Sequence, residues 1–365
     1  MVVHMAFSKL RFAALLIVAS VFAAPALFAQ AALATQTPAE EAPKKVRTTT
    51  FFDSEDPVAL TLSINLKQIR GDKGDDAPWR GASISYTDPS GKKIEIPIKA
   101  RTRGIWRLKN CEFPPLRLNF PEKATVGTQF EGLNKPKLVS YCRNSDTFEQ
   151  YVLQEMQLYR AYNLLTPASH KARLLRLTYA DSASGKVMTT RYAILLEEPD
   201  AMAARFKGGI IDQVGAVAAD LEPEHMRLSG VFQYFIANTD HSINGLHNFE
   251  LLAREDGTVL PVAYDFDFAG AVNASYATVD PQFSTIVRVR DRLFRGYCAP
   301  AEEYAKTFSL FREKKDAIYG LYSDKIGQLM NKRIAAETLD FYGDFYKTIE
   351  DSRRAKRDIL DKCRK

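Results

Sequence analysis

Apolar and polar residues alternate along much of the first half of the chain, which is the pattern of half-buried β-strands. Clusters of Gly, Asp, Pro and Ser separate several of these runs and predict turns between them. One helix is expected in this half, over residues 146–165, with Asp146 and Glu149 as a capping pair at its start. The runs that predict strands lie at residues 59–120, 137–142, 172–180 and 189–197.

The second half of the chain has the period of helices. From Glu222 onward the pattern is helical, apart from one hairpin near residues 249–264, and residues 301–365 are helical throughout. We therefore expect an α+β protein with two lobes and a cleft between them. The N-terminal lobe (57–200) is β-rich with one helix, and the C-terminal lobe (201–365) is mainly helical and carries the hairpin.

The first residues have the three parts of a secretory signal peptide. Lys9 and Arg11 are basic, and the apolar residues 12–24 are too few to span a bilayer comfortably. Small residues then offer cleavage sites after Ala29 or Ala34. The alternatives are a buried N-terminal helix and an uncleaved anchor.

A polar segment follows the apolar one at once, which favours a cleaved signal peptide over those alternatives. We expect a signal peptide at residues 1–34 and a disordered linker at 35–56. The mature protein should be periplasmic or secreted, with no integral membrane span after signal removal.

Charge and cysteine content narrow the class of protein further. Removing Lys9 and Arg11 lowers the formal net charge from +6 to +4, which is too mild for a nucleic-acid binder. The four cysteines are an even number, so disulfides are expected in an oxidising compartment. None lies in a CxxC pair, which disfavours a zinc site. We expect the pairs Cys111–Cys142 and Cys298–Cys363, each within one lobe.

The residues that indicate chemistry lie between Phe232 and Gly270. A helix ends near Asp240, and a hairpin follows with Asp256-Gly257 at its turn. A two-residue turn there would place Asn248 opposite Asp265, with Cβ atoms about 5 Å apart. Asp240 would reach the same place from the end of the helix.

Two carboxylates and an amide oxygen suit Mg²⁺ that also binds phosphate oxygens, because this ion takes few protein ligands. The remaining carboxylate can orient a hydroxyl nucleophile, as phosphoryl transfer requires. The alternative is an acidic loop beside a solvated strand end, which is what single aspartates at turns usually are.

The stretch from Ile236 to Gly270 resembles the C-terminal lobe of CotH-type (spore coat protein H) atypical kinases, and more distantly HipA-like kinases. The segment RTRGIWRLKNCEFPPLRLNF (101–120) is similar to the Arg-Gly turn and basic strand that replace a glycine-rich loop in CotH proteins. The resemblance implies a two-lobed protein-kinase-like fold that binds ATP with Mg²⁺ or Mn²⁺. The sequence differs from ordinary protein kinases because it contains no GxGxxG and no HRD motif.

The resemblance also assigns roles to particular residues. It makes Asp240 the catalytic residue, Asn248 and Asp265 metal ligands, and Asp267 a possible second-metal ligand. The loop between Asp240 and Asn248 is longer than usual, so Asn244 is a rival for the amide role. The resemblance also implies that Arg103 and Gly104, which form the Arg-Gly turn, bind the nucleotide.

A kinase-like site also needs a cation on the phosphates and a carboxylate to hold it. Lys135 and Lys137 have the same strand parity, and Pro136 confines the regular strand to Lys137 onward. In the next helix Glu155 shares a face with aromatic residues and needs a partner, for which Lys137 is the first choice. A solvated Glu155 and a surface Lys137 are the alternative. The acidic residues at 197–198 lie where an adenine-binding hinge would be.

We therefore predict an exported atypical kinase that moves a phosphoryl group from Mg-ATP to a hydroxyl of a protein or other envelope acceptor. A non-catalytic binding or structural protein of the envelope is the first alternative. A metal-dependent hydrolase that uses His241 and His247 with the acidic cluster is the second, although no helix has HExxH spacing. The arginines between residues 288 and 295 are expected on a solvated helix face.

Overall fold

The computed structural model describes residues 46–74 and 76–365. The predicted signal peptide, 1–34, lies outside the described residues, as does the predicted linker up to residue 45. The rest of that linker packs on the protein, because Phe51 and Phe52 are buried in a short 3₁₀-helix at Phe51–Asp53. Residues 45–365 form one unit, and the description below concerns that unit alone.

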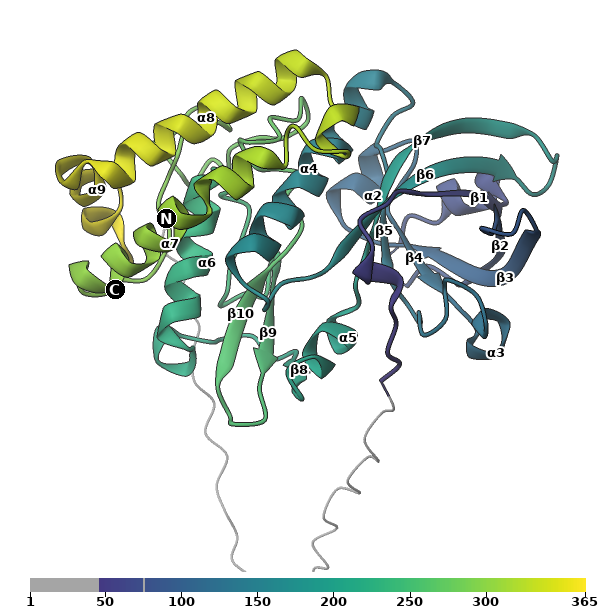
Figure 1. Ribbon diagram of the computed structural model, residues 1–365, viewed down its shortest axis with the longest axis horizontal. Coiled ribbons are helices and arrows are strands. Elements are labelled where there is room, and N and C mark those ends of the chain that lie inside the picture. Colours follow the sequence, from purple (N-terminus) through teal and green to yellow (C-terminus); the bar gives the residue numbers. More distant parts are fainter. Residues whose placement is uncertain (1–45, 75) are drawn as a thin grey trace, which may run out of the picture. The chain divides into compact units, whose positions relative to one another are not determined.

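Seven of the described strands close into a β-barrel. They are β1 (Val58–Ile64), β2 (Arg80–Thr87), β3 (Lys93–Thr102), β4 (Leu116–Asn119), β5 (Lys137–Val139), β6 (Ala172–Asp181) and β7 (Val187–Leu196). Their order around the barrel is β1-β2-β3-β4-β5-β7-β6 (Figure 1). Every neighbouring pair is antiparallel except β1 and β6, which are parallel and close the barrel.

The alternating pattern explains these strands. In β1, Val58, Leu60, Leu62 and Ile64 are buried, and the residues between them are exposed or half-buried. Successive side chains of a strand point to opposite faces, so every second residue faces the barrel interior. The strand pattern read from the sequence is confirmed in all four of its runs.

The two-lobed kinase-like fold with a single helix in the N-terminal lobe is wrong. The β-strands form a closed mixed barrel, and four helices rather than one lie between the first and last barrel strands of the described chain. The three unforeseen ones have only four to six residues, too few for a helical period to be seen in the sequence. They are α1 (Leu66–Gly71), α2 (Trp106–Asn110) and α3 (Glu122–Thr125), beside the expected α4 (Asp146–Leu165).

Helix α4 packs against β6 and β7 and also against the C-terminal helix α7 (Ala301–Gly320), as Figure 1 shows. Every residue from Val152 to Tyr162 is buried, so this part of the helix lies inside the protein. The expected capping pair does not form at its start. Asp146 and Glu149 instead accept hydrogen bonds from Arg191, and Glu149 also accepts from the Tyr192 N–H.

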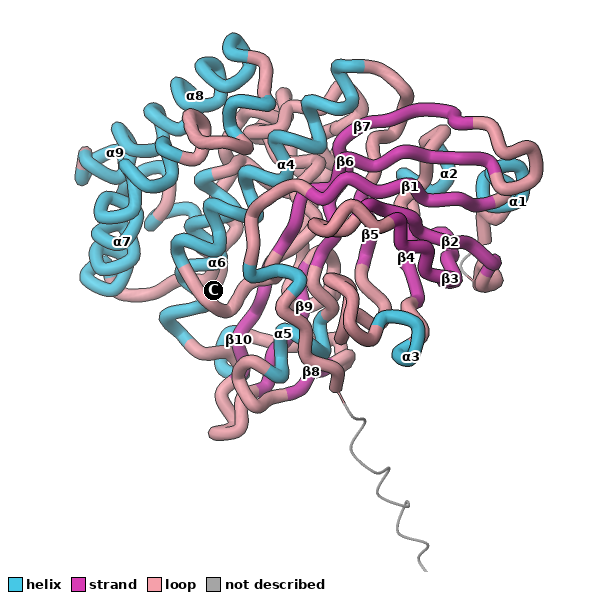
Figure 2. The backbone as a smooth tube through the Cα atoms, turned by 45° about the vertical axis from the view of Figure 1, so that its right-hand side comes forward, coloured by secondary structure: helices cyan, strands magenta, loops and turns pink. Residues whose placement is uncertain are grey.

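The second half contains a smaller sheet and most of the helices. In Figure 2 the helices α6 to α9 gather apart from the barrel strands. The three described strands of this sheet have the order β10-β9-β8, all antiparallel. The elements are α5 (Pro199–Ala204), β8 (Gly209–Ile211), α6 (Pro223–Phe235), β9 (Phe249–Ala253), β10 (Val259–Ala263), α8 (Lys332–Glu350) and α9 (Ser352–Asp358).

The hairpin β9–β10 has a different register from the one predicted. Phe249 is opposite Ala263, and the Tyr264 N–H donates to the Asn248 carbonyl at 3.1 Å, so Asn248 is opposite Tyr264 rather than Asp265. The two-residue turn is wrong because the loop has three residues. Gly257 has φ +83°, the left-handed conformation that completes a type I turn with a one-residue bulge.

Both predicted disulfides are confirmed. Cys111, directly after α2, is bonded to Cys142, which follows β5. Cys298, shortly before α7, is bonded to Cys363 near the C-terminus. Within the described part of the chain no helix combines the length and the apolar character needed to cross a membrane.

Candidate functional site

A pocket of about 460 Å³ lies between the segment that follows β3 and the loops that flank the β9–β10 hairpin. Aspartates from the hairpin side face arginines from the barrel side across it, and a tryptophan and a phenylalanine add apolar surface. Its lining residues are Arg103, Gly104, Ile105, Trp106, Arg107, Pro115, Asp240, Leu246, His247, Asn248, Tyr264, Asp265, Asp267 and Phe268.

Asp240 is positioned by its neighbours in the loop after α6. Its N–H donates to Asn238 Oδ1 at 3.0 Å. One carboxylate oxygen is 2.8 Å from Nε2 of His247, and the other accepts from the Asn248 amide at 3.2 Å. Two side chains therefore fix the direction of the Asp240 carboxylate, which remains 40% exposed toward the pocket.

Asn248 and Asp265 reach the pocket although they are not opposite each other in the hairpin. Both have left-handed backbones, with φ +54° at Asn248 and φ +61° at Asp265. Asn and Asp adopt this conformation more readily than other side chains, and it turns each residue away from the regular strand direction. Such conformations cost of order 1 kcal/mol and concentrate at functional sites.

Two more carboxyl groups lie behind Asp265. Asp267 and Glu155 of α4 are both buried, and burial followed by the charge of Asp265 raises the pKa of Asp267 to about 7. Burial, then Asp267 and Asp265, raises the pKa of Glu155 well above its usual range. Glu155 Oε1 has no hydrogen-bond partner among the described residues. Asp265 therefore stands in front of two buried carboxyl groups that keep their protons more readily than free ones, because three negative charges cannot be held so close together.

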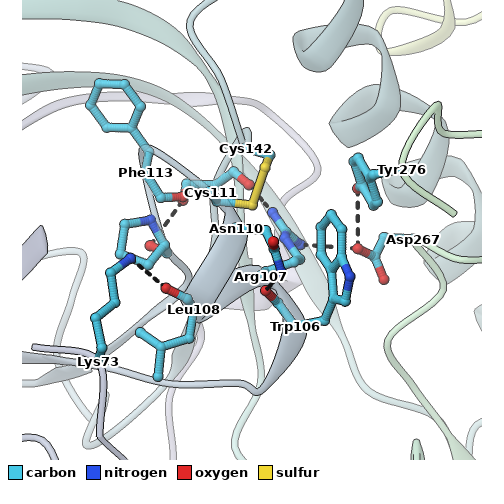
Figure 3. The surroundings of a disulfide bond; sticks show 12 residues. Lys73, Trp106, Arg107, Leu108, Asn110, Cys111, Phe113, Cys142, Asp267 and Tyr276 are labelled. Atoms are coloured by element: carbon cyan, nitrogen blue, oxygen red, sulfur yellow. Dashed lines mark hydrogen bonds and ion pairs between the residues drawn. A yellow bond between two sulfur atoms is a disulfide. The ribbon is translucent and has the colours of Figure 1, made fainter.

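Two arginines lie beside these carboxyl groups. Arg103 Nη2 is 3.8 Å from Asp265 Oδ2, and Arg107 Nη1 is 3.7 Å from Asp267 Oδ2. Tyr276 donates its hydroxyl to Asp267 as well, at 3.1 Å (Figure 3). Burial opposes the charge of Arg107, but Tyr276 and the acidic groups outweigh it and raise the pKa of Arg107.

Arg107 was not expected at the site, and Figure 3 shows how the fold places it there. It lies on α2, which ends at the Cys111–Cys142 disulfide, and it donates to the Ser140 carbonyl just before Cys142. The sequence held a usable signal, because Arg107 precedes the bridged Cys111 by four residues, which is about one helical turn. The helix and the disulfide together therefore fix the backbone that carries this arginine.

The predicted ion pair of Lys137 with Glu155 is wrong. Lys137 Nζ is 2.9 Å from Glu250 Oε1 and 3.9 Å from the centre of the Tyr264 ring. His170 Nε2 is 2.8 Å from the other oxygen of Glu250. Lys137 and Glu155 are separated because β5 directs the lysine toward β9, whereas Glu155 faces the segment after β10.

Neither lysine lines the pocket described above. Lys137 is buried within its pair with Glu250. The strand β5 begins at Lys137, as Pro136 predicted, and Lys135 lies before it, where its backbone hydrogen-bonds to the Glu198 carboxylate. The nucleotide contacts expected of Lys135 and Lys137 stay predictions.

The two loop histidines and the arginine run have different surroundings. His241 is buried, and His247 contacts Asp240. Within residues 46–74 and 76–365, no group of three or more His, Cys, Asp and Glu side chains is arranged to hold a metal ion. The arginine run is not a helix face, because residues 288–295 form no helix. Arg292 donates to the Phe235 carbonyl at the end of α6 and to the Phe341 carbonyl of α8, and Arg295 donates to carbonyls of the loop after α6.

The chain matches no protein-family model, and it matches no curated protein.

Proposed function

We propose that this protein is an exported phosphotransferase related to the CotH-type atypical kinases. It transfers a phosphoryl group from ATP, with Mg²⁺ or Mn²⁺, to a hydroxyl group of a protein or another envelope component. The observation that carries the proposal is that Asp240, Asn248 and Asp265 line one pocket, which arginines border on the other side.

The side chains suit a hard cation. The Asp265 carboxylate is 29% exposed, and its nearest cation, Arg103, is 3.8 Å away, so its oxygens can take a ligand. The NH₂ group of Asn248 donates to Asp240, which leaves the amide oxygen as the metal-binding atom. Asp265 and Asn248 would hold the ion, with Asp267 as a further ligand, and the ion when bound would neutralise phosphate charge.

The other residues divide the remaining tasks. Arg103 and Gly104 lie at the barrel side of the pocket, where a guanidinium can bind phosphate oxygens. Asp240, held by His247 and Asn248, orients the acceptor hydroxyl and accepts its proton. Trp106 and Phe268 supply apolar surface that excludes water from part of the pocket.

The cysteines support the export part of the proposal. All four form disulfides within the described chain, which is expected of proteins that mature in an oxidising compartment. Together with the signal-peptide pattern at residues 1–34, this favours a periplasmic or secreted site of action.

The test is incubation of the full chain with γ- or α-labelled ATP and Mg²⁺ or Mn²⁺, together with calorimetric nucleotide titration. Asp265→Ala should weaken metal-dependent nucleotide binding by about 10- to 100-fold, as for the loss of a metal-site group. Asp240→Ala should leave binding within about twofold and lower transfer by about 10²- to 10⁴-fold, because it acts on the acceptor. Asn248→Ala should fall between the two and improve with more Mg²⁺ or with Mn²⁺.

The matched control is Asp212→Ala, which removes an exposed aspartate that does not line the pocket. Its binding and transfer should equal those of the wild type. Incorporation of the α-label would indicate nucleotidyl transfer in place of phosphoryl transfer. Nucleotide binding without transfer would favour the non-catalytic alternative, and tight zinc binding without nucleotide binding would favour the hydrolase.

A further inference from the structure

Arg295 lies behind the loop that carries Asp240. Its Nη1 donates to the Thr239 carbonyl at 2.5 Å and to the His241 carbonyl at 2.7 Å. One guanidinium therefore binds the carbonyls on both sides of Asp240. It does not line the pocket, so it acts on the loop rather than on a ligand.

This contact completes the hydrogen bonding of the loop. The loop is not helical, so the carbonyls of residues 239–241 cannot be satisfied as they would be inside a helix. The carbonyl of Asp240 accepts a hydrogen bond from the Asn248 amide at 2.7 Å, and Arg295 donates to the carbonyls of Thr239 and His241. Two side chains thus define the path of the backbone through Asp240.

Arg295 is itself held in place. Its guanidinium lies 4.6 Å from the centre of the Phe283 ring. The segment after it is joined to the C-terminus, since the Arg364 N–H donates to the Gly296 carbonyl at 2.9 Å and the Cys298 N–H donates to the Arg364 carbonyl at 2.8 Å. The Cys298–Cys363 disulfide closes this connection covalently.

We propose that Arg295 is a positioning residue for Asp240 and that the Cys298–Cys363 disulfide holds Arg295 in the position where it can do this. The proposal rests on the proposed function, in which Asp240 orients the acceptor hydroxyl. Burial lowers the pKa of Arg295 to about 10, so the side chain still carries its charge at neutral pH. Misplacement of a reacting group by about 1 Å can cost on the order of 100-fold in rate.

The variants are Arg295→Gln and Arg295→Lys in the full chain. Arg295→Gln should lower kcat on the order of 10- to 100-fold and leave the nucleotide Kd within about twofold, since Asp240 serves the acceptor. Arg295→Lys should recover part of the loss, because an ammonium can still donate to one carbonyl. Arg288→Gln is the matched control, since the Arg288 side chain is 82% exposed and pairs with Asp291.

Amide hydrogen exchange of residues 236–249 gives a readout that does not depend on activity. Exchange should be faster in Arg295→Gln, less so in Arg295→Lys, and unchanged in Arg288→Gln. The double variant Cys298→Ser with Cys363→Ser should change kcat and exchange in the same direction by a smaller amount. If it behaves like the wild type while Arg295→Gln does not, the part assigned to the disulfide is refuted.

Two results would overturn the role of Arg295. The first is wild-type kcat with wild-type exchange in Arg295→Gln. The second is an equal loss of nucleotide binding in Arg295→Gln and Arg295→Lys, which would show a general collapse of the pocket. If the wild type neither binds nor transfers, the proposed function fails, whereas the exchange data still decide whether Arg295 holds the loop.

Discussion

Replacing Lys137 with methionine should destabilise the fold strongly, because the change leaves the Glu250 carboxylate in the interior without its main counter-ion. The side chains of Lys137 and Glu250 are 8% and 11% exposed. Burial alone would raise the pKa of Glu250, but Lys137 and then His170 outweigh it and lower this pKa from 4.5 to about 2. For Glu250 that shift corresponds to about 3 kcal/mol at neutral pH, and burial, which lowers the pKa of Lys137, offsets part of it in the intact pair. Removing one partner leaves the other charge buried and unpaired, which costs about 3–5 kcal/mol.

The lowered pKa of Glu250 also determines how the stability difference between the two proteins should change with pH. In the wild type the contribution of Glu250 is present above pH 4.5 and is lost as pH falls toward 2, because the folded-state pKa is the lower one. In Lys137→Met the buried carboxylate is destabilising, and protonation relieves it. The stability gap between the two proteins should therefore narrow as pH falls.

Urea unfolding at pH 7.5 and at pH 4.5, followed by tryptophan fluorescence, measures the gap. The double variant Lys137→Met with Glu250→Gln is the control, and it should recover about 2 kcal/mol because it removes the unpaired charge. A Lys137→Met protein within about 1 kcal/mol of the wild type at pH 7.5 would refute the reasoning. So would a gap that stays constant with pH.

Three smaller predictions concern single side chains. Gly270→Ala should cost about 2–4 kcal/mol, because its Cβ would lie 2.5 Å from the Val289 carbonyl oxygen. Gly257→Ala should cost only about 1 kcal/mol, because its Cβ meets open space and only the left-handed backbone is strained. Equal losses in urea unfolding would contradict this distinction. Burial lowers the pKa of His225 from 6.5 to about 4, so His225 should destabilise the fold as pH falls through this interval, by up to about 3 kcal/mol. His225→Gln should flatten the slope of stability against pH there, and an unchanged slope would refute the assignment.

Local patterns predicted the elements of this protein better than their assembly. The alternation in β1 and β3 marks which side chains face inward, and pairs of cysteines near predicted strands and helices gave both disulfides. The parallel contact of β1 with β6 joins segments far apart in the sequence. No local period reports such a contact, so the closed barrel was missed.

The residues of the candidate site were predicted correctly in part, but the geometric reason given for them was wrong. Asp240, Asn248 and Asp265 do line one pocket, but the hairpin register on which this expectation rested is shifted by one residue. Left-handed backbones at Asn248 and Asp265 compensate for the shift. Lys137 was assigned the wrong partner because Glu250 is far from it in the sequence. Only the folded structure brings β9, which carries Glu250, next to β5.

The parallel pairing of β1 with β6 also constrains how the chain can fold during synthesis. β1 leaves the ribosome early, yet its pairing edge has no partner until residues 175–181 have been made. Until then β1 to β5 can form only an open sheet in which one edge of β1 is free, and such an edge is prone to pair with other chains. A chain that emerges N-terminus first, from the ribosome or from an export pore, should therefore depend on a holding chaperone until β6 emerges, and chains arrested before β6 should be the most sensitive to its removal.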